Sequence, residues 1–176
     1  MFMENSNDIK NQLEKAKSLT NQEKFQEALE ILDDLYESNP HSEEIKNNLI
    51  NTLFDYGGYL NDYYILEYEK AKQIFKRITQ LNPDSYRALY NIGIAYFNLG
   101  QMKKAIIYFE KALKLKPDYK YCLYNIGLVY EDLEKYDEAL KFYEQALEID
   151  PNFTYALAAR SDIRRKLDTL KQMNID

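Results

Sequence analysis

The sequence contains Leu-Tyr-Asn-Ile-Gly twice, and this repetition constrains the fold more than any other feature. The two copies begin at Leu89 and Leu123, 34 residues apart. The match continues without a gap when residues 86–119 are placed over residues 120–153. Self-similarity at a fixed period of about 20–50 residues is typical of an array of stacked supersecondary units. The chain is therefore expected to fold as such an array.

Each unit predicts two α-helices joined by a short turn. Apolar residues recur every three or four positions on both sides of Gly100, as they do on the buried face of a helix. Lys116 precedes Pro117, and a residue before proline is disfavoured in the α region, so the second helix should end there. Gly93 and Gly127 are expected where the two helices of a hairpin cross, because a Cβ atom would hold the helices apart.

A fixed order of large, small and aromatic residues recurs in the third and fourth units. The third has Leu89, Gly93, Tyr96, Ala105, Phe109, Ala112 and Pro117, and the fourth has Leu123, Gly127, Tyr130, Ala139, Tyr143, Ala146 and Pro151. This order resembles the tetratricopeptide repeat family, in which Trp usually occupies the first of these positions. The resemblance implies an all-α fold, a right-handed α–α superhelix (solenoid) of helix–turn–helix repeats.

The same frame extends over most of the chain and predicts one domain, residues 1–176. We expect repeats over about 9–42, 43–85, 86–119 and 120–153, followed by a capping helix over about 154–173. In that last helix, Arg160, Ser161 and Arg164 occupy positions where a partner helix would otherwise pack. Such a polar face is what the end of a repeat array requires in water.

The second repeat carries nine extra residues, which we place near 57–67. Gly57 and Gly58 are predicted to end its first helix, and Asn61 or Asp62 to cap a lengthened second helix. The alternative is a first helix that continues through both glycines. That alternative costs about 2 kcal/mol in helix propensity relative to alanine.

The sequence gives little support for catalysis. The one histidine, His41, follows a proline in a turn between repeats, and Cys122 has no basic residue placed beside it by a recognised motif. There is no glycine-rich phosphate loop, no CxxC pair and no HExxH motif. We expect a protein that is not an enzyme and that binds no cofactor and no metal.

The charge and hydropathy of the sequence limit the classes of partner and the cellular location that we expect for the chain. The net charge is −6, without a concentrated Lys/Arg surface, so nucleic acid is not an expected partner. No apolar stretch reaches the roughly 18 residues of a membrane span, and the first ten residues lack the apolar segment of a secretory signal. A single cysteine excludes an internal disulfide. These observations predict a soluble cytoplasmic protein.

The resemblance also implies a binding surface, because the first helices of successive tetratricopeptide repeats line a concave groove that receives a peptide or a partner helix. The predicted groove residues are Asn48, Asn91 and Asn125 at one equivalent position, Asn47, Tyr90 and Tyr124 beside them, Asn51 farther along, and Arg87, Tyr121 and Tyr155 at the outer edge. Carboxamides can both donate to and accept from a peptide backbone. The other interpretation is that these amides bond only within the array.

Several functions remain open at this point. One subgroup of the family grips the carboxyl terminus of heat-shock chaperones with a Lys/Asn/Asn/Lys/Arg clamp, but no register of this chain supplies the paired cations. We expect a non-enzymatic adaptor that is a monomer or a weak homodimer. The alternatives are the repeat region of a larger enzyme or co-chaperone, and a self-association module that uses a tyrosine-rich insert: Tyr56, Tyr59, Tyr63, Tyr64 and Tyr68.

Overall fold

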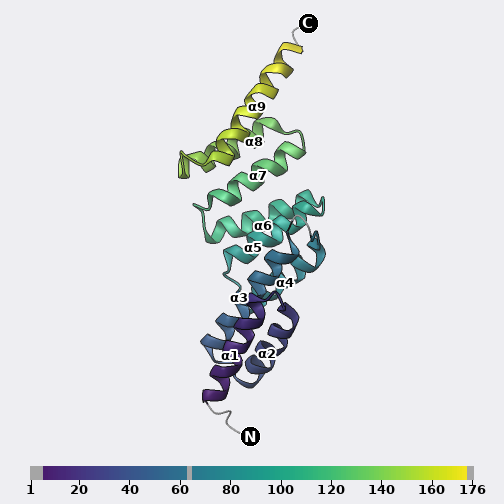
Figure 1. Ribbon diagram of the computed structural model, residues 1–176. Helices are drawn as coiled ribbons and strands as arrows, with labels where there is room; N and C mark the ends of the chain where they lie inside the picture. The colour runs from purple at the N-terminus through teal and green to yellow at the C-terminus, as the bar shows by residue number, and fades with distance from the viewer. Residues whose placement is uncertain (1–5, 63–64, 174–176) are drawn as a thin grey trace. The chain divides into compact units, whose positions relative to one another are not determined.

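The structure, a computed structural model, describes residues 6–62 and 65–173, and over these residues it is all-α without a strand (Figure 1). The nine helices of these described residues are α1 Ser6–Asn21, α2 Phe25–Ser38, α3 Glu43–Leu60, α4 Tyr68–Leu81, α5 Tyr86–Asn98, α6 Met102–Leu115, α7 Lys120–Asp132, α8 Tyr136–Ile149 and α9 Thr154–Met173. The predicted all-α class and the helix–turn–helix pairs are confirmed.

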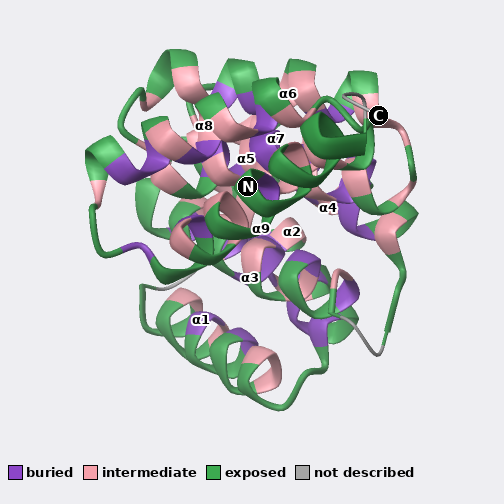
Figure 2. Ribbon diagram, turned by 90° about the horizontal axis from the view of Figure 1, so that it is seen from above, coloured by how far each residue is buried: buried purple, intermediate pink, exposed green. Residues whose placement is uncertain are grey.

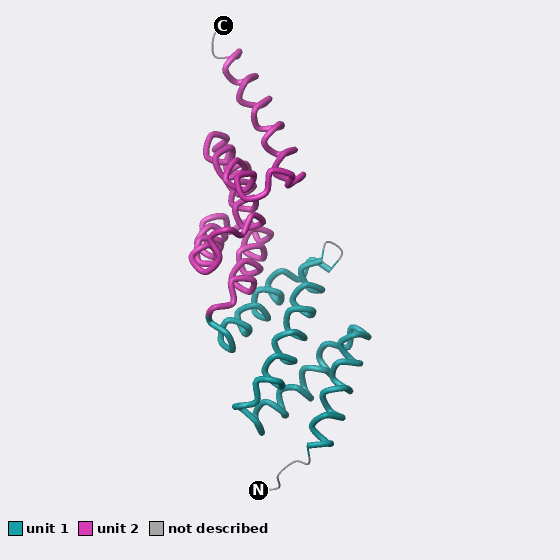
Figure 3. Tube along the Cα trace, turned by 90° about the vertical axis from the view of Figure 1, so that its left-hand side faces the viewer, with its two compact units in different colours: residues 1–83 teal, residues 84–176 magenta. Residues whose placement is uncertain are grey.

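The helices form two compact units, Met1–Pro83 and Asp84–Asp176 (Figure 3). In unit 1, α1 packs on α2 and α3 packs on α4, and α3 also contacts both helices of the first hairpin. In unit 2, α5 packs on α6 and α7 packs on α8, while α9 lies against α8 and α7. Within each unit every helix therefore packs on its neighbour in sequence. The proposed repeat boundaries, and one array across both units, stay predictions.

Each helix buries one face and exposes the other (Figure 2). On the second helices of the third and fourth repeats, the buried positions are the alanines and aromatic residues of the repeated pattern. Ala105, Phe109, Ala112, Ala139, Tyr143 and Ala146 are all fully buried. A single hairpin cannot bury such a face alone, so stability must come from stacking on neighbours.

The crossing of α5 with α6, and of α7 with α8, depends on glycine. A Cβ atom built on Gly93 would lie 2.5 Å from the Phe109 ring, and one on Gly127 would lie 2.4 Å from the Tyr143 ring. Both distances are well below van der Waals contact. The predicted positions of the two crossing glycines are confirmed.

The prediction for the second repeat is wrong, because α3 runs through Gly57 and Gly58 and ends at Leu60. Asn61 does not cap a second helix but forms the C-cap of α3, where its N–H donates to the Gly57 and Gly58 carbonyls. The reason is tertiary packing. A Cβ atom on Gly57 would lie 2.7 Å from Phe75, which is fully buried, so Gly57 is the crossing glycine of this hairpin.

Because Gly57 is the crossing glycine, α3 must be aligned with α5 and α7 by this glycine and not by the start of the helix. The aromatic residue three positions before each crossing glycine packs on the ring of the following helix: Phe54 on Phe75 at 6.2 Å, Tyr90 on Phe109 at 5.8 Å and Tyr124 on Tyr143 at 5.7 Å between ring centroids. By the same count, the α3 residue that corresponds to Asn91 and Asn125 is Asp55. Asn48 lies two helical turns earlier on the same face.

The hairpin turns share one backbone feature, a residue with positive φ immediately before the N-cap of the second helix. These residues are Glu23, Leu66, Gly100 and Glu134, with φ of 60°, 55°, 70° and 57°. Glycine adopts this left-handed conformation at little cost, whereas other L-residues are strained there. Only the third repeat has glycine at this position.

The helix predicted over about 154–173 is observed as α9. Ala156 and Ile163 are fully buried, whereas Leu170 near its end is 42% exposed. Lys166 Nζ pairs with Glu131 at 2.7 Å, and Glu131 also accepts a hydrogen bond from the Tyr143 hydroxyl at 2.8 Å. These contacts attach α9 to the last hairpin. Its role as the end of the array stays a prediction.

Candidate functional site

The first helices of unit 2 carry a continuous row of aromatic rings. Tyr119, in the loop before α7, lies between Tyr90 and Tyr121, with centroid distances of 5.0 and 5.8 Å. Phe153, at the equivalent place before α9, contacts Tyr121 at 5.2 Å and Tyr124 at 5.6 Å. The row thus links α5, α7 and α9 through the residues that precede each helix.

Two rings of this row are open to solvent. Tyr121 is 44% exposed and Tyr155 is 63% exposed, whereas Phe153, which contacts both, is 5% exposed. Tyr121 and Tyr155 stand at the same position of successive repeats, the second residue of α7 and of α9. The spacing of the two tyrosines therefore follows from the repeat. The buried Phe153 ring contacts both tyrosine rings and so positions them.

The asparagines lie along the same helices. The Asn91 side chain donates to the Arg87 carbonyl at 2.8 Å, and Asn125 donates to the Tyr121 carbonyl at 2.8 Å and to the Tyr90 hydroxyl at 3.0 Å. Both N–H groups of Asn125 are thus used within the unit. Among the described residues, no hydrogen bond is made to the carboxamide oxygen of either asparagine. A ligand can therefore use these side chains chiefly as hydrogen-bond acceptors, through the carboxamide oxygens.

Three tyrosines of the row, Tyr90, Tyr119 and Tyr124, are neutral at pH 7. Burial raises the pKa of Tyr90 and, to a smaller extent, those of Tyr119 and Tyr124 above the ordinary value of 10. A phenol with a raised pKa stays protonated at neutral pH and keeps its O–H as a donor. The hydroxyls therefore add hydrogen-bonding capacity to the face without adding charge.

Charged groups at this face are few. Arg87 is the single charged residue of α5. Lys120, the first residue of α7, pairs with Asp150 at 2.5 Å and lies 5.0 Å from the Phe153 ring centroid. This ion pair raises the pKa of Lys120 and lowers that of Asp150. The face formed by α5 and the first part of α7 therefore has no unpaired carboxylate.

The family assignment follows from the repeat and is supported by comparison. The tetratricopeptide repeat family model matches residues 84–152, the third and fourth units. Residues 84–152 are therefore a tetratricopeptide repeat region. Domains of this family are typically protein–protein interaction modules and are usually non-catalytic. No curated protein matches the chain.

Solved tetratricopeptide structures share the fold. The MamA protein superposes with a TM-score of 0.69 at 22% identity, covering 89% of this chain and 81% of MamA. The first tetratricopeptide domain of Spaghetti (RPAP3), bound to the HSP90 peptide SRMEEVD, gives 0.61 at 24% identity and covers 68% and 93%. YrrB, a protein with an unusual peptide-binding site, gives 0.59 at 19% identity and covers 85% and 90%. At these identities the likeness is one of fold.

The predicted groove residues of the second repeat lie in unit 1. Asn48 and Asn51 line a cleft of about 210 Å³ between α1 and α3, together with Thr20, Thr52 and Asp55. Asn48 donates to the Glu44 carbonyl at 2.8 Å, as the asparagines of unit 2 do within their own helices. Asn47 is exposed on α3. Because these residues belong to the other unit, one ladder of Asn48, Asn91 and Asn125 stays a prediction.

The single cysteine is not a reactive thiol in this structure. Cys122 is fully buried, and its thiol donates to the Phe109 carbonyl at 3.2 Å. Burial raises the pKa of this thiol to about 12, so almost no thiolate forms at neutral pH. Within residues 6–62 and 65–173, no His, Cys, Asp and Glu side chains gather as a metal site would require. Nor does any described helix combine the length and hydropathy needed to cross a bilayer.

The tyrosine-rich insert is partly structural. Tyr56 stacks on Phe25 at 5.1 Å and Tyr59 contacts the same ring at 5.4 Å, so both attach α3 to the start of α2. Tyr63 and Tyr64 lie outside the described residues.

Sequence reasoning missed Tyr119 and Phe153, which hold the row of unit 2 together. A signal was present, because each is an aromatic residue two positions after a repeat proline. The rings of Tyr90 and Tyr124 are also more buried than a groove position suggests, since both pack on the following helix.

Proposed function

We propose that this chain is a non-enzymatic, cytoplasmic adaptor that binds an extended peptide or a partner helix. The binding face in unit 2 would be formed by α5, α7 and α9, the first helices of their repeats. The observation that carries this proposal is the row of aromatic rings with Asn91 and Asn125 alongside it. Tyrosine suits such a face because it combines a large apolar ring with a polar tip.

The chemistry of the face favours recognition of a peptide backbone. The carboxamide oxygens of Asn91 and Asn125 can accept hydrogen bonds from the N–H groups of an extended strand, which every residue but proline carries. The exposed faces of Tyr121 and Tyr155 offer apolar area for side chains of that strand. Specificity would then come from the rings and affinity partly from the backbone.

The charge of the face favours a partner segment of low charge over an acidic carboxyl terminus. Spaghetti binds the acidic HSP90 peptide SRMEEVD. In this chain Arg87 is the only charged residue of α5, and Lys120 is already neutralised by Asp150. A chaperone clamp is therefore not the proposed activity.

A displayed library of random peptides tests the proposal. The chain is used as bait, and the selected peptides are then titrated against a Tyr121→Ala/Tyr155→Ala variant. Each truncated ring should cost about 1–2 kcal/mol, so binding should weaken by about 30-fold or more. A matched control, Leu133→Ala/Ile149→Ala, removes two apolar side chains of 41% and 39% exposure elsewhere in unit 2. Equal loss in both variants would refute the proposed face.

The asparagines require a separate variant, Asn91→Ala/Asn125→Ala. Each hydrogen bond lost to a peptide is worth about 0.5–1.5 kcal/mol, so the pair should weaken binding by about 5- to 150-fold. The internal bonds of both side chains are lost as well, so the thermal midpoint should also fall. If the amides serve only the internal bonds to Arg87, Tyr121 and Tyr90, the thermal midpoint should fall and the affinity should not change. Measurement of both quantities on one variant separates these interpretations.

A further inference from the structure

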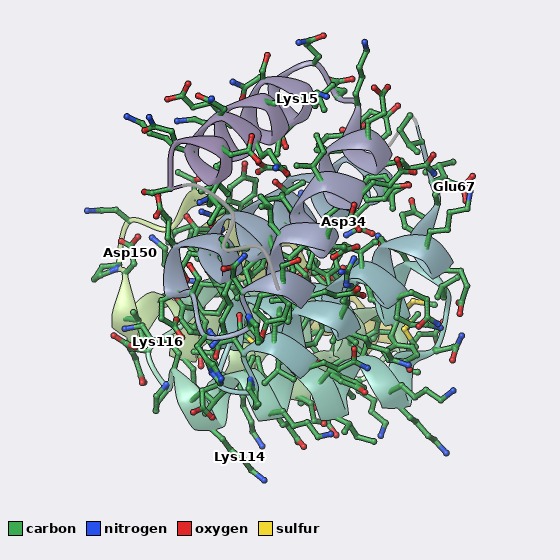
Figure 4. The ribbon with its side chains drawn as sticks, turned by 90° about the horizontal axis from the view of Figure 1, so that it is seen from below. Lys15, Asp34, Glu67, Lys114, Lys116 and Asp150 are labelled. Carbon is green, nitrogen blue, oxygen red and sulfur yellow. The ribbon has the colours of Figure 1, made fainter. Side chains whose placement is uncertain are left out.

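The outer face of α6 carries a basic stripe. Lys104, Lys111 and Lys114 are exposed along one side of the helix, and Ile107, 49% exposed, stands between them. None of the three lysines forms an ion pair with a described carboxylate. Lys104 donates to Gln101 at 2.8 Å, and the Lys111 ammonium lies 4.8 Å from the Tyr108 ring centroid. Neither contact neutralises the positive charge. In Figure 4 the Lys114 side chain extends away from the ribbon.

The outer face of α2 carries the opposite charge. Its exposed acidic residues are Glu27, Glu30, Asp34 and Glu37, and the helix contains no basic residue. Within the described part of the chain these four carboxylates have no ion-pair partner. Asp33, on the adjacent side of the helix, is already paired with Arg77 of α4. The stripe on α2 is therefore an unneutralised acidic surface of unit 1.

The two stripes match in spacing as well as in sign. The intervals along Glu27, Glu30, Asp34 and Glu37 are three, four and three residues, and the same intervals separate the four positions Lys104, Ile107, Lys111 and Lys114. At about 1.5 Å per residue, each stripe is about 15 Å long. Because the intervals are symmetric, parallel and antiparallel alignments each bring three lysines opposite three carboxylates. We propose that α6 of one copy of this chain docks on α2 of a second copy.

The salt dependence of this contact has a diagnostic sign. A chain with net charge −6 repels its copies, so any association that ignored the stripes would strengthen when salt screens that repulsion. Docking of opposite stripes should instead weaken with salt, because exposed charges are screened beyond about 10 Å at 0.1 M and about 3 Å at 1 M. Weak association at low salt that disappears at high salt is therefore expected.

The test is sedimentation velocity on the full chain at concentrations up to about 0.5 mM, since exposed ion pairs each contribute little. The association constant should be at least about tenfold larger at about 0.02 M than at about 0.5 M salt. A chain that stays monomeric at low salt, or that associates more strongly at high salt, would overturn the proposal.

Charge reversal identifies the surfaces. One variant reverses the α6 stripe, Lys104→Glu/Lys111→Glu/Lys114→Glu, and should remain monomeric. A second reverses all four acidic residues of the α2 stripe, Glu27→Lys/Glu30→Lys/Asp34→Lys/Glu37→Lys, and should also remain monomeric alone. A chain with both reversals has a net charge within two of the parent's and opposite stripes again in either alignment, so its self-association should return. If the double reversal stays monomeric although circular dichroism shows parental helicity, the stripes are not the contact.

A matched control separates the stripe from the net charge. The variant Lys10→Glu/Lys15→Glu/Lys17→Glu makes the same change in net charge at three exposed positions of α1. At low salt, this control should lower the association constant by less than half as much as the α6 reversal does. Equal loss in the two triple variants would show that global repulsion, not docking of α6, controls association, and would overturn the proposal.

Discussion

Adjacent glycines in α3 should respond differently to the same substitution. Gly58 is exposed, and a Cβ atom built on it would meet nothing within 4 Å. Gly57 is buried at the crossing with α4, and its Cβ atom would lie 2.7 Å from Phe75. We therefore expect Gly58→Ala to stabilise the protein, and Gly57→Ala to be clearly less stable than Gly58→Ala.

The magnitude follows from two terms. Alanine is favoured over glycine inside a helix by about 0.8–1.0 kcal/mol, and this term is common to both variants. Only Gly57→Ala adds the cost of overpacking, typically about 1–3 kcal/mol, because a Cβ atom 2.7 Å from the fully buried Phe75 ring forces the ring or the backbone to shift. The propensity terms cancel in the comparison. The two variants should therefore differ by about 1–3 kcal/mol in the free energy of unfolding.

Urea unfolding followed by circular dichroism measures both variants against the parent. Two results would refute the reasoning. If Gly58→Ala lowers the stability, Gly58 is not in the interior of an exposed helix. If Gly57→Ala is as stable as Gly58→Ala, then α3 and α4 do not cross at Gly57.

A double-mutant cycle with Phe75→Leu locates the clash. Leucine is smaller at the point of contact, so the cost of a methyl group at Gly57 should largely disappear in that background. The coupling free energy should be about 1–2 kcal/mol, within the range found for residues in contact. A coupling near zero would mean that Gly57→Ala acts through some other neighbour.

Three further predictions concern the rest of the molecule. Glu134→Gly should stabilise the fourth repeat by about 0.5–1 kcal/mol, because relief of left-handed strain of about 1–2 kcal/mol exceeds the entropy cost of glycine; unchanged stability in urea would contradict this. Burial raises the pKa values of Tyr90 and Tyr143, and that of Cys122 to about 12. The folded state therefore binds these protons more tightly, so stability should be fully present below about pH 9 and fall as the pH rises through 10 and above. Urea midpoints that stay constant from about pH 9 to 11 would refute this. Removal of residues 154–176 uncovers the apolar face of α8 and should cause aggregation, whereas a monomeric truncated chain with parental stability would show that α9 is not a cap.

The third and fourth repeats could be predicted from sequence in detail, because their order of residues repeats without a gap. The crossing glycines Gly93 and Gly127 are among these predictions. The second repeat could not, because helix propensity alone disfavours a helix that continues through two adjacent glycines. A local cost of about 2 kcal/mol was outweighed by the packing of a buried ring. The sequence does contain a signal for this crossing, an aromatic residue three positions before a glycine. The pair Phe54 and Gly57 has the same spacing as the pairs Tyr90 and Gly93, and Tyr124 and Gly127.

The candidate site shows a related limit. Sequence spacing placed Tyr121 and Tyr155 at equivalent positions, and the structure brings each of them into contact with Phe153. Spacing could not show how the asparagine amides are used, because the bonds of Asn125 to Tyr90 and Tyr121 depend on side-chain direction. Nor could it show that Tyr90 and Tyr124 pack inward on α6 and α8. The position of a residue along a helix determines the face on which it lies, but not how deeply its side chain is buried.

The extra residues of the second repeat are accommodated by helical geometry. Helix α3 has 18 residues where α5 has 13, and the remaining four extend the turn before α4. From the start of the helix, the crossing glycine is displaced by seven residues relative to Gly93. Seven residues rotate an α-helix by about 700°, only about 20° short of two full turns. The lengthened helix therefore presents the same face to its partner, so Phe54 and Gly57 meet Phe75 as Tyr90 and Gly93 meet Phe109. A displacement of five residues would have turned the pair about 140° away from α4. This explains why the helix could grow while the hairpin crossing was kept.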